Sequence, residues 1–475
     1  MLFNSLSFGI FFSIVFLLYW KMPHKFRRPL LLIASYYFYM CWNPKYIILI
    51  LFTTAVSYFS ALILEKQERD SIRKSVLMIA LTLCLGILFV FKYFNFASES
   101  IAKGLQMISL SVNPITLEIL LPVGISFYTF QNLSYVIDVY KGRVQPEHNF
   151  GIYATFISFF PQLVAGPIER SENLLPQIKS EKTFDYESAS YGLKLMAWGF
   201  FKKLAIADVV ARYVDTAYSS LPTRTGFDFV VATFFFTIQI YCDFSGYSDI
   251  AIGTAKLLGV NLMTNFKSPY FSKSIKEFWD RWHISLSTWF KDYIYIPLGG
   301  NRCSQLKTNR NLFVTFLTSG LWHGANWTYV FWGGIHGLAL IIEKSMGKIQ
   351  IGNSRLGRLI KWLFVFAFCN ISWIFFRAES IQDAFYIIKT VFTDAMHPSV
   401  FAHTTLGISK RDVMFIIVSI SILSLYDFVA LKKDVIMWIS SKPAIIRWAV
   451  YLILIWLILL LMPPFGTSDF VYFQF

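Results

Sequence analysis

Three of the seven histidines lie in an apolar, aromatic part of the chain, where a polar side chain needs a reason. They are His283, His323 and His336, and the other four histidines lie in basic or polar loops. A neutral imidazole can act as a general base on a hydroxyl group, and this chemistry suits acyl transfer from a thioester. Intramembrane histidines also serve in the proton relays of transporters. The residue types alone leave both kinds of chemistry open.

The spacing around His323 favours this histidine over His336. On one straight helix each residue turns by about 100°, so Asn326 would share a face with His323. His336 would lie nearly on the opposite side of that helix, and it is surrounded by glycines that suit tight helix packing, at 333, 334 and 337. We therefore predict a functional His323 and a structural His336. For either residue alone, a packed and hydrogen-bonded histidine is the more common explanation.

His283 has a possible carboxylate partner close by in sequence. Asp280 lies three residues before it and Ser287 four residues after it, so the three would share one helical face. A carboxylate in this position could orient the imidazole and raise its basicity. The alternative is an interfacial histidine that simply forms a hydrogen bond with Asp280.

Further polar side chains interrupt apolar runs, and ionisable groups at such depth are functional candidates by default. Gln131 lies in one of these runs, and Asp243, Tyr247 and Asp249 lie in "IYCDFSGYSDIAIG". Asp243 and Tyr247 share a helical face. Pairing with a neighbouring helix explains each of these residues equally well, and a proton path through His323 and Asp243 is the corresponding transporter hypothesis.

The composition predicts a membrane protein whose helices hold these residues. Of the 475 residues, 56% are hydrophobic and 15% are charged, against about 25% charged in soluble domains. Twelve apolar runs predict about eleven spans in one domain, residues 1–475. The runs cover about residues 5–20, 29–42, 46–64, 75–92, 118–140, 151–166, 190–214, 227–259, 311–343, 357–376, 411–431 and 443–463.

The charge distribution orients these spans. The net charge of +15 fits the positive-inside rule better than nucleic-acid binding in so apolar a chain. The first basic residues, at 21–28, follow the first apolar run, which places the N-terminus outside; a later basic stretch, at 344–361, marks a cytosolic loop, which places the stretch 378–410 outside. We predict a multi-pass membrane protein.

The middle of the chain departs from a simple pattern of spans. Residues 271–302 are rich in both aromatic and charged groups, which is typical of interfacial or re-entrant helices. The run 311–343 would be roughly 50 Å long at about 1.5 Å per residue, more than the bilayer core of about 30 Å. It must tilt, project or break, and Gly333–Gly334 is the expected position of a break.

Several enzyme classes lose support because their motifs are missing. The sequence contains no GxSxG, no P-loop, no HExxH and no GxGxxG. The five cysteines form no CxxC pair, so we predict neither a disulfide framework nor a metal site.

Two long motifs decide between the open alternatives. "NFKSPYFSKSIKEFWDRWHISLSTWFKDYIYIPLGG" and "TSGLWHGANWTYVFWGGIHG" resemble the membrane-bound O-acyltransferase family. The likeness extends over residues 1–475 and is strongest to the bacterial alginate O-acetyltransferase branch, which is related to the D-alanyl transfer proteins of teichoic acid synthesis. Supporting stretches include "FFPQLVAGPIER" and the terminal "FVYFQF".

The resemblance implies an all-α fold around a central cavity and assigns the site. The family's invariant histidine falls on His323, its second active-site position falls on His283, and His336 matches a recurrent histidine without a settled role. A tunnel from the cytosol would admit the acyl donor, and a funnel from outside would admit the acceptor or a partner. We predict that the segments 122–140, 239–250 and 275–300 line this cavity, with His323 near its narrowest point.

The resemblance also implies a reaction. The chain is predicted to be a multi-pass protein of the bacterial cytoplasmic membrane that moves an acyl group, expected to be acetyl, from a cytosolic thioester to an exported polysaccharide. Acetyl-CoA is the expected donor, no permanently bound cofactor is expected, and an extracytoplasmic transferase is the expected partner. D-alanyl transfer from an acyl carrier protein is the alternative within the family. A proton-coupled transporter and a non-catalytic export scaffold are the alternatives outside it.

Overall fold

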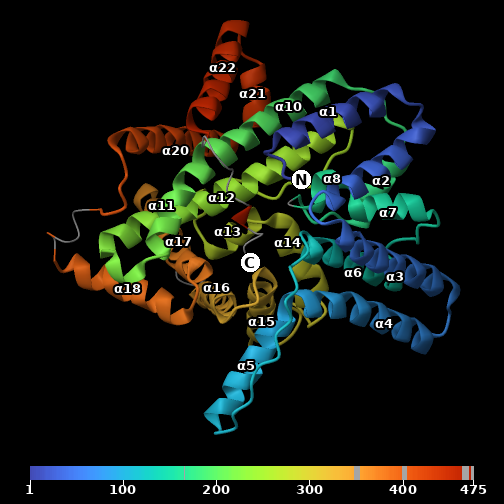
Figure 1. Cartoon of the computed structure of the whole chain (residues 1–475), viewed down its shortest axis with the longest axis horizontal. Coiled ribbons are helices and arrows are strands. Elements are labelled where there is room, and N and C mark those ends of the chain that lie inside the picture. The colour runs from blue at the N-terminus through green and yellow to red at the C-terminus, as the bar shows by residue number, and fades with distance from the viewer. Residues whose placement is uncertain (165, 347–353, 398, 400–403, 463–469, 472–475) are drawn as a thin grey trace. The chain divides into compact units, whose positions relative to one another are not determined.

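The computed structural model describes residues 1–475 except 165, 347–353, 398, 400–403, 463–469 and 472–475. Within the described part the regular structure is helical and contains no strand, so the predicted all-α fold is confirmed (Figure 1). Of the terminal stretch at 470–475, the described residues are Phe470 and Val471.

Six described helical segments are long and apolar enough to cross a membrane, and together they confirm a multi-pass membrane protein. They are Pro44–Lys66, Asp70–Met107, Gly226–Leu257, Arg355–Arg377, Lys410–Ala430 and Ala444–Leu461. The shorter apolar helices Leu6–Lys21 and Phe150–Leu163 accompany them. Six is fewer than the eleven spans predicted, because several apolar runs fold into short or interrupted helices.

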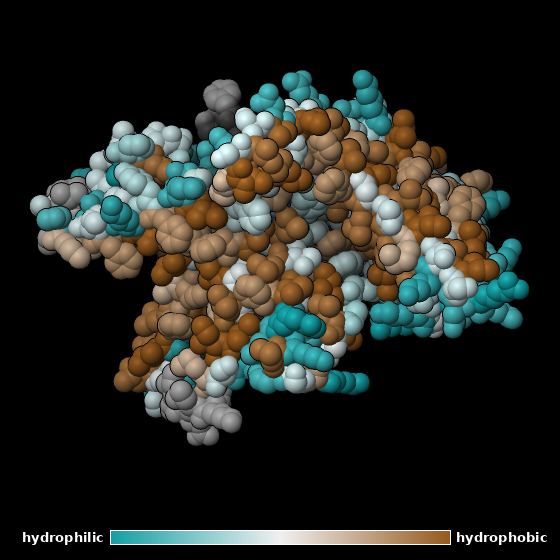
Figure 2. All heavy atoms as spheres, turned by 90° about the horizontal axis from the view of Figure 1, so that it is seen from below, coloured by the Kyte–Doolittle hydropathy of each residue, from teal (hydrophilic) through white to brown (hydrophobic). Residues whose placement is uncertain are grey.

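Apolar side chains cover the outside of these helices. The helix α22 (Ala444–Leu461) has no buried residue although it is almost wholly apolar, which is stable only against lipid or another apolar partner. Figure 2 shows broad apolar areas on one face of the protein, with hydrophilic groups at their edges.

The chain forms two compact units, and the prediction of a single functional domain is not tested by this division. The first unit comprises residues 1–193 and 251–263. Its helices are α1 (Leu6–Lys21), α2 (His24–Met40), α3 (Ile47–Lys66), α4 (Asp70–Leu88), α5 (Phe94–Met107), α6 (Ile125–Tyr140), α7 (Phe150–Ser158), α8 (Phe160–Leu163) and α9 (Ser171–Lys179). Two helices, α10 (Tyr186–Phe200) and α12 (Gly226–Leu257), continue from one unit into the other.

Buried polar side chains join α3, α6 and α7 in the first unit. The Ser57 hydroxyl donates to Asn132 Oδ1 at 2.7 Å, and the Tyr153 hydroxyl lies 2.7 Å from Ser57 Oγ. Gln131 Nε2 donates to Phe156 O at 2.8 Å, and Gln131 Oε1 accepts from Gln162 at 3.0 Å. Gln131 therefore has a structural task within this unit, whatever else it does.

The second unit comprises residues 194–250 and 264–475. It contains a π-helical turn at Phe201–Ala207, followed by α11 (Asp208–Tyr218), α13 (Ile275–Arg281), α14 (Ile284–Phe290), α15 (Gln305–His323), α16 (Trp327–Met346), α17 (Arg355–Arg377), α18 (Ile381–Ala395), α20 (Lys410–Ala430), α21 (Val435–Ser440) and α22. The helices α13 and α14 have seven residues each, about 10 Å at 1.5 Å per residue. They cannot cross a bilayer, as predicted for this segment.

The predicted long helix 311–343 is a helical hairpin. The helix α15 ends at His323 and α16 begins at Trp327, so the break predicted at Gly333–Gly334 is in the wrong place. The glycines instead allow the two helices to touch: a Cβ on Gly320 would lie 2.2 Å from Tyr329 O, and one on Gly333 would lie 2.3 Å from Phe316 O. Tight packing, rather than helix breaking, explains these glycines.

Candidate active site

The two histidines assigned by resemblance lie side by side in the second unit. His323 is the last residue of α15 and His283 directly precedes α14. Their ring centroids are 6.4 Å apart, and the exposed fractions of the two residues are 2% and 0%. Two residues 40 positions apart in the sequence therefore share one enclosed site.

Aromatic rings surround this histidine pair. The Trp332 ring lies edge-on to the His323 ring, with 5.2 Å between the ring centroids, and the centroid of the Phe376 ring lies 5.4 Å from that of His323. Phe244, from α12, packs edge-on against His283 at 4.5 Å. Burial lowers the pKa of His283 to about 3, so its ring is neutral at physiological pH. A ring with so low a pKa is a weak base, so His283 is suited to accept a hydrogen bond and to orient a neighbouring group rather than to take up a proton.

Asp280 does not orient His283, and this prediction is wrong. The helix α13 ends at Arg281, and His283 adopts left-handed backbone angles, φ 43° and ψ 54°. The turn destroys the three-residue helical spacing on which the pairing depended. Asp280 instead forms an ion pair with Lys276 at 2.6 Å, with 61% of its side chain exposed.

Asn326 does not share a helical face with His323, because the helix ends between them. Its Oδ1 accepts a hydrogen bond from Thr328 N at 3.0 Å, at the start of α16. Its Nδ2 donates to the backbone oxygen of Glu379 at 2.9 Å. Asn326 therefore fixes the turn after His323 and joins it to the connection between α17 and α18.

A cavity of about 510 Å³ opens beside this connection. Its walls include Tyr218, Ala378, Glu379, Asp383 and Tyr386. Ala378 lies two residues after Phe376, the residue whose ring contacts His323. Hydroxyl and carboxylate groups therefore line this cavity, and one of its wall residues lies two positions after a residue that contacts His323.

His336 is held by hydrogen bonds on both ring nitrogens. Trp279 Nε1 donates to His336 Nδ1 at 3.2 Å, since an indole nitrogen can only donate. His336 Nε2 lies 3.1 Å from Ser372 Oγ, and that hydroxyl donates its own proton to Cys369 O at 2.8 Å. Nε2 therefore carries the proton. Such a ring cannot accept another proton without breaking the bond to Trp279, so the predicted structural role of His336 agrees with its geometry.

The substitution His336→Ala should reduce stability before it affects chemistry. It would leave Trp279 and Ser372 without their partner and open a cavity in a fully buried ring cluster, at an expected cost of about 3 kcal/mol. His336→Gln should cost less, because an amide supplies one acceptor and one donor. Thermal unfolding of the detergent-purified protein measures this order. Normal stability with lost activity in His336→Ala would contradict it.

Asp243 belongs to a buried ionic network that the sequence reading missed. Lys203 Nζ lies 2.7 Å from Asp243 Oδ1 and 2.8 Å from Asp208 Oδ1, and Val471 N donates to Asp243 Oδ2 at 2.6 Å. Tyr247 lies under Lys203, with the ammonium 5.4 Å from its ring centroid. The shared face of Asp243 and Tyr247 thus binds a cation from a neighbouring helix, which was the structural alternative.

A second lysine extends the network. Lys202 Nζ lies 2.7 Å from Asp249 Oδ2 and 2.8 Å from Ser245 Oγ. Both lysines lie in the π-helical turn Phe201–Ala207, and such turns are frequent at functional sites. The sequence signal was available: two adjacent lysines interrupt the apolar run 190–214, and charges at that depth need partners.

The sequence model of the membrane-bound O-acyltransferase family matches residues 144–381, which include His283, His323 and their aromatic enclosure. The chain belongs to the membrane-bound O-acyltransferase family. The match includes residues of both structural units. Within the part of the chain that the structure describes, no group of three His, Cys, Asp or Glu side chains is arranged to hold a metal.

Curated relatives of this acyltransferase agree with the family assignment. The chain is 42% identical to the probable alginate O-acetylase AlgI of Pseudomonas aeruginosa, over 83% of this chain and 75% of that protein. It is 34% identical to the peptidoglycan O-acetyltransferase of Helicobacter pylori, over 82% and 79%. The teichoic acid D-alanyltransferase of Streptococcus thermophilus is 28% identical, over 54% and 68%. The predicted family and the enzyme class, an O-acetyltransferase, are confirmed.

Two predictions about the acyltransferase site stay open. The catalytic roles of His323 and His283 rest on the resemblance to the family and on the contact between their rings, and they stay predictions. The common cavity of the segments 122–140, 239–250 and 275–300 involves residues of both units and stays a prediction.

Proposed function

We propose that this acyltransferase transfers an acetyl group from acetyl-CoA in the cytosol to a hydroxyl group of an exported polysaccharide, across the bacterial cytoplasmic membrane. The names of its relatives support the acetyl group and the polysaccharide acceptor. The observation that carries the proposal is the contact between two buried histidine rings, His283 and His323, at the end of a helical hairpin.

His323 acts as the general base in this proposal. Its ring nitrogen takes the proton of the acceptor hydroxyl while the hydroxyl oxygen attacks the thioester carbonyl carbon. The carbon–sulfur bond then breaks, the thiolate leaves, and it takes up the proton from the imidazolium to give free CoA and the ester. The neutral His283, in ring contact, orients His323 or the acceptor.

The acceptor is proposed to approach through the cavity at the connection between α17 and α18. Glu379, Asp383 and Tyr386 on its walls are suited to hydrogen-bond sugar hydroxyls. Because His323 is 2% exposed, the aromatic side chains around it must move for donor and acceptor to meet there. An extracytoplasmic transferase is the proposed partner, which presents the polysaccharide hydroxyl to this cavity.

The donor is proposed to bind at the basic cytosolic loops. The net charge of +15 attracts the phosphates of CoA. It would attract an acidic carrier protein as well, so charge does not separate acetyl transfer from D-alanyl transfer. The coverage of the relatives does favour acetyl transfer: the O-acetyltransferases match over 82–83% of the chain, against 54% for the D-alanyltransferase.

The donor can be tested with the purified protein in detergent. We expect release of free thiol from acetyl-CoA, with transfer of labelled acetyl to polysaccharide in membranes that contain the chain. A protein that leaves acetyl-CoA intact but consumes D-alanyl carrier protein would replace this proposal by the D-alanyl alternative. If membranes that contain the chain consume neither acetyl-CoA nor D-alanyl carrier protein, the proposed thioester chemistry is wrong.

A further inference from the structure

His283 has a backbone conformation that disfavours any residue with a side chain. Its φ of 43° and ψ of 54° lie in the left-handed region, where Cβ crowds the following carbonyl oxygen. Among the described residues other than glycine, only Ser109 and Ser268 also have a positive φ. Such strained residues persist when their surroundings hold them, and they gather at active sites.

Hydrogen bonds from residues 265–267 hold the turn that contains His283. The backbone oxygen of Asn265 accepts from Ile284 N at 2.9 Å, on the far side of His283. Lys267 N donates to Arg281 O at 3.0 Å, on the near side. The backbone on both sides of His283 is therefore bonded to residues 265–267, and these bonds restrain the turn.

The side chain of Asn265 adds a second set of bonds to the same turn. Its Oδ1 accepts from Ser285 Oγ at 2.7 Å and from Ser285 N at 3.3 Å. Its Nδ2 donates to Ser248 Oγ on α12 at 3.2 Å. Asn265 is fully buried, and its side-chain amide can accept through the oxygen and donate through the nitrogen at once.

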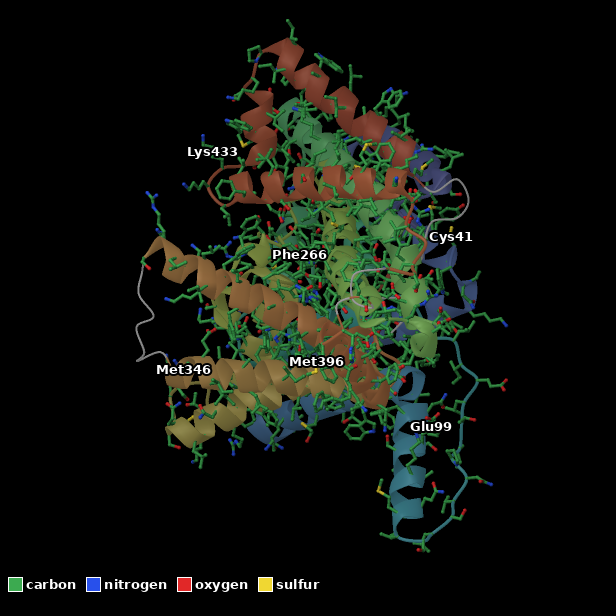
Figure 3. The ribbon with its side chains drawn as sticks, turned by 90° about the vertical axis from the view of Figure 1, so that its left-hand side faces the viewer. Cys41, Glu99, Phe266, Met346, Met396 and Lys433 are labelled. Carbon is green, nitrogen blue, oxygen red and sulfur yellow. The ribbon has the colours of Figure 1, made fainter. Side chains whose placement is uncertain are left out.

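The ring of Phe266, the residue after Asn265, packs against aromatic side chains next to His283. Phe266, labelled in Figure 3, contacts Trp282 edge-on at 5.1 Å and Phe244 at 5.0 Å. Phe244 in turn contacts the His283 ring. Hydrogen bonds from Asn265 fix the His283 backbone, and aromatic contacts fix its ring.

We infer that Asn265 is the positioning residue that holds His283 in its left-handed conformation and so directs its ring toward His323. This inference rests on the proposed function of the histidine pair. Without the side-chain amide of Asn265, the two backbone bonds remain, but the turn loses its anchor at Ser285 and its tie to Ser248, and the favoured right-handed region becomes accessible at residue 283. The Cα–Cβ bond would then point elsewhere, and the ring would leave its place 6.4 Å from His323.

The test compares two buried asparagines in the full-length, detergent-purified protein. Asn311 is also fully buried, and it ties α15 to a neighbouring turn through Nδ2 bonds to Leu298 O and Gly300 O. Asn265→Ala should lower the kcat of acetyl-CoA turnover by about 100-fold, the effect of a displacement of about 1 Å at a reacting group. KM should stay unchanged, because the interaction acts on the reaction rather than on donor binding. Asn311→Ala should leave kcat per folded molecule near wild type.

A milder variant keeps the inference falsifiable if Asn265→Ala does not fold. Ser285→Ala removes the Oγ donor to Asn265 and leaves the backbone donor in place, so kcat should fall by about fivefold at normal yield. Equal kcat losses in Asn265→Ala and Asn311→Ala, or an unchanged kcat in Ser285→Ala and Asn265→Ala, would overturn the positioning role while leaving the proposed function intact. A wild-type protein without turnover would instead contradict the proposed function and, with it, the role of His283.

Discussion

Replacement of His323 by alanine is expected to lower acetyl transfer by about 10²- to 10⁴-fold, the usual contribution of a general base. The imidazole lies at the end of α15, in ring contact with His283. Without it, the neighbouring imidazole of His283 is too weak a base to replace it, because burial lowers the pKa of His283 to about 3, and the acceptor hydroxyl attacks the thioester far more slowly. Free-thiol release from acetyl-CoA and O-acetate on the exported polymer measure the loss.

The matched variants separate chemistry from packing. His323→Ala also removes a ring that packs on Trp332 and Phe376, so folding must be measured alongside activity. His323→Gln retains a polar side chain of similar size but cannot take a proton at neutral pH, and it should be as inactive as His323→Ala at higher stability. Asp280→Asn is a control three residues before His283, and it should be fully active because 61% of the Asp280 side chain is exposed and its carboxylate pairs with Lys276.

Retained transfer in His323→Gln would remove His323 from the chemistry. The family membership would still hold, because it rests on the sequence match over residues 144–381. Reduced activity in Asp280→Asn would show that this carboxylate acts on the site through a conformation other than the present one.

The sequence singled out candidate site residues, but it did not predict their geometry. His323 and His283 could be singled out because two specific motifs contain them, and the structure brings the two rings together. Composition and apolar runs were sufficient for an all-α, multi-pass protein. These features depend on residue type and on patterns local in the chain.

The predicted geometry failed at two places where a helix was assumed to continue and a turn is present instead. Asn326 and Asp280 were assigned to helical faces shared with His323 and His283, but a turn separates each from its histidine. Helices at 3.6 residues per turn fix such faces only while they remain unbroken. The turns depend on contacts distant in sequence, such as Gly320 against Tyr329 and Asn265 against Ile284, which no local pattern predicts.

The second large effect is expected at Lys203, where Lys203→Met should destabilise the protein by about 3–5 kcal/mol. Lys203 is fully buried and lies within 2.8 Å of one oxygen of Asp208 and one of Asp243. Methionine has a similar length but no charge, so two buried carboxylates would face each other without their shared cation. Unfolding of the purified protein by heat or denaturant measures the change.

Lys202 is the matched control, since it is the adjacent residue in the same π-helical turn. Its partner Asp249 has 21% of its side chain exposed, against 1% for Asp243, and Lys202→Met would leave one carboxylate without its ion-pair partner, against two for Lys203→Met. Lys202→Met should cost clearly less than Lys203→Met. Adding Asp243→Asn to Lys203→Met should recover part of the lost stability, because it removes one of the two unpaired charges.

Equal costs at the two lysines would show that the number and burial of the unpaired carboxylates do not set the size of the effect.

The network also bears on the site, because Asp243, Phe244 and Ser248 lie within six consecutive residues of α12. Phe244 packs on His283 and Ser248 accepts from Asn265, so the ion pair that fixes Asp243 also fixes the wall of the histidine site. The folded fraction of Lys203→Met should therefore turn over acetyl-CoA more slowly than that of Lys202→Met, and equal turnover would mean that the network stabilises the fold without positioning the site.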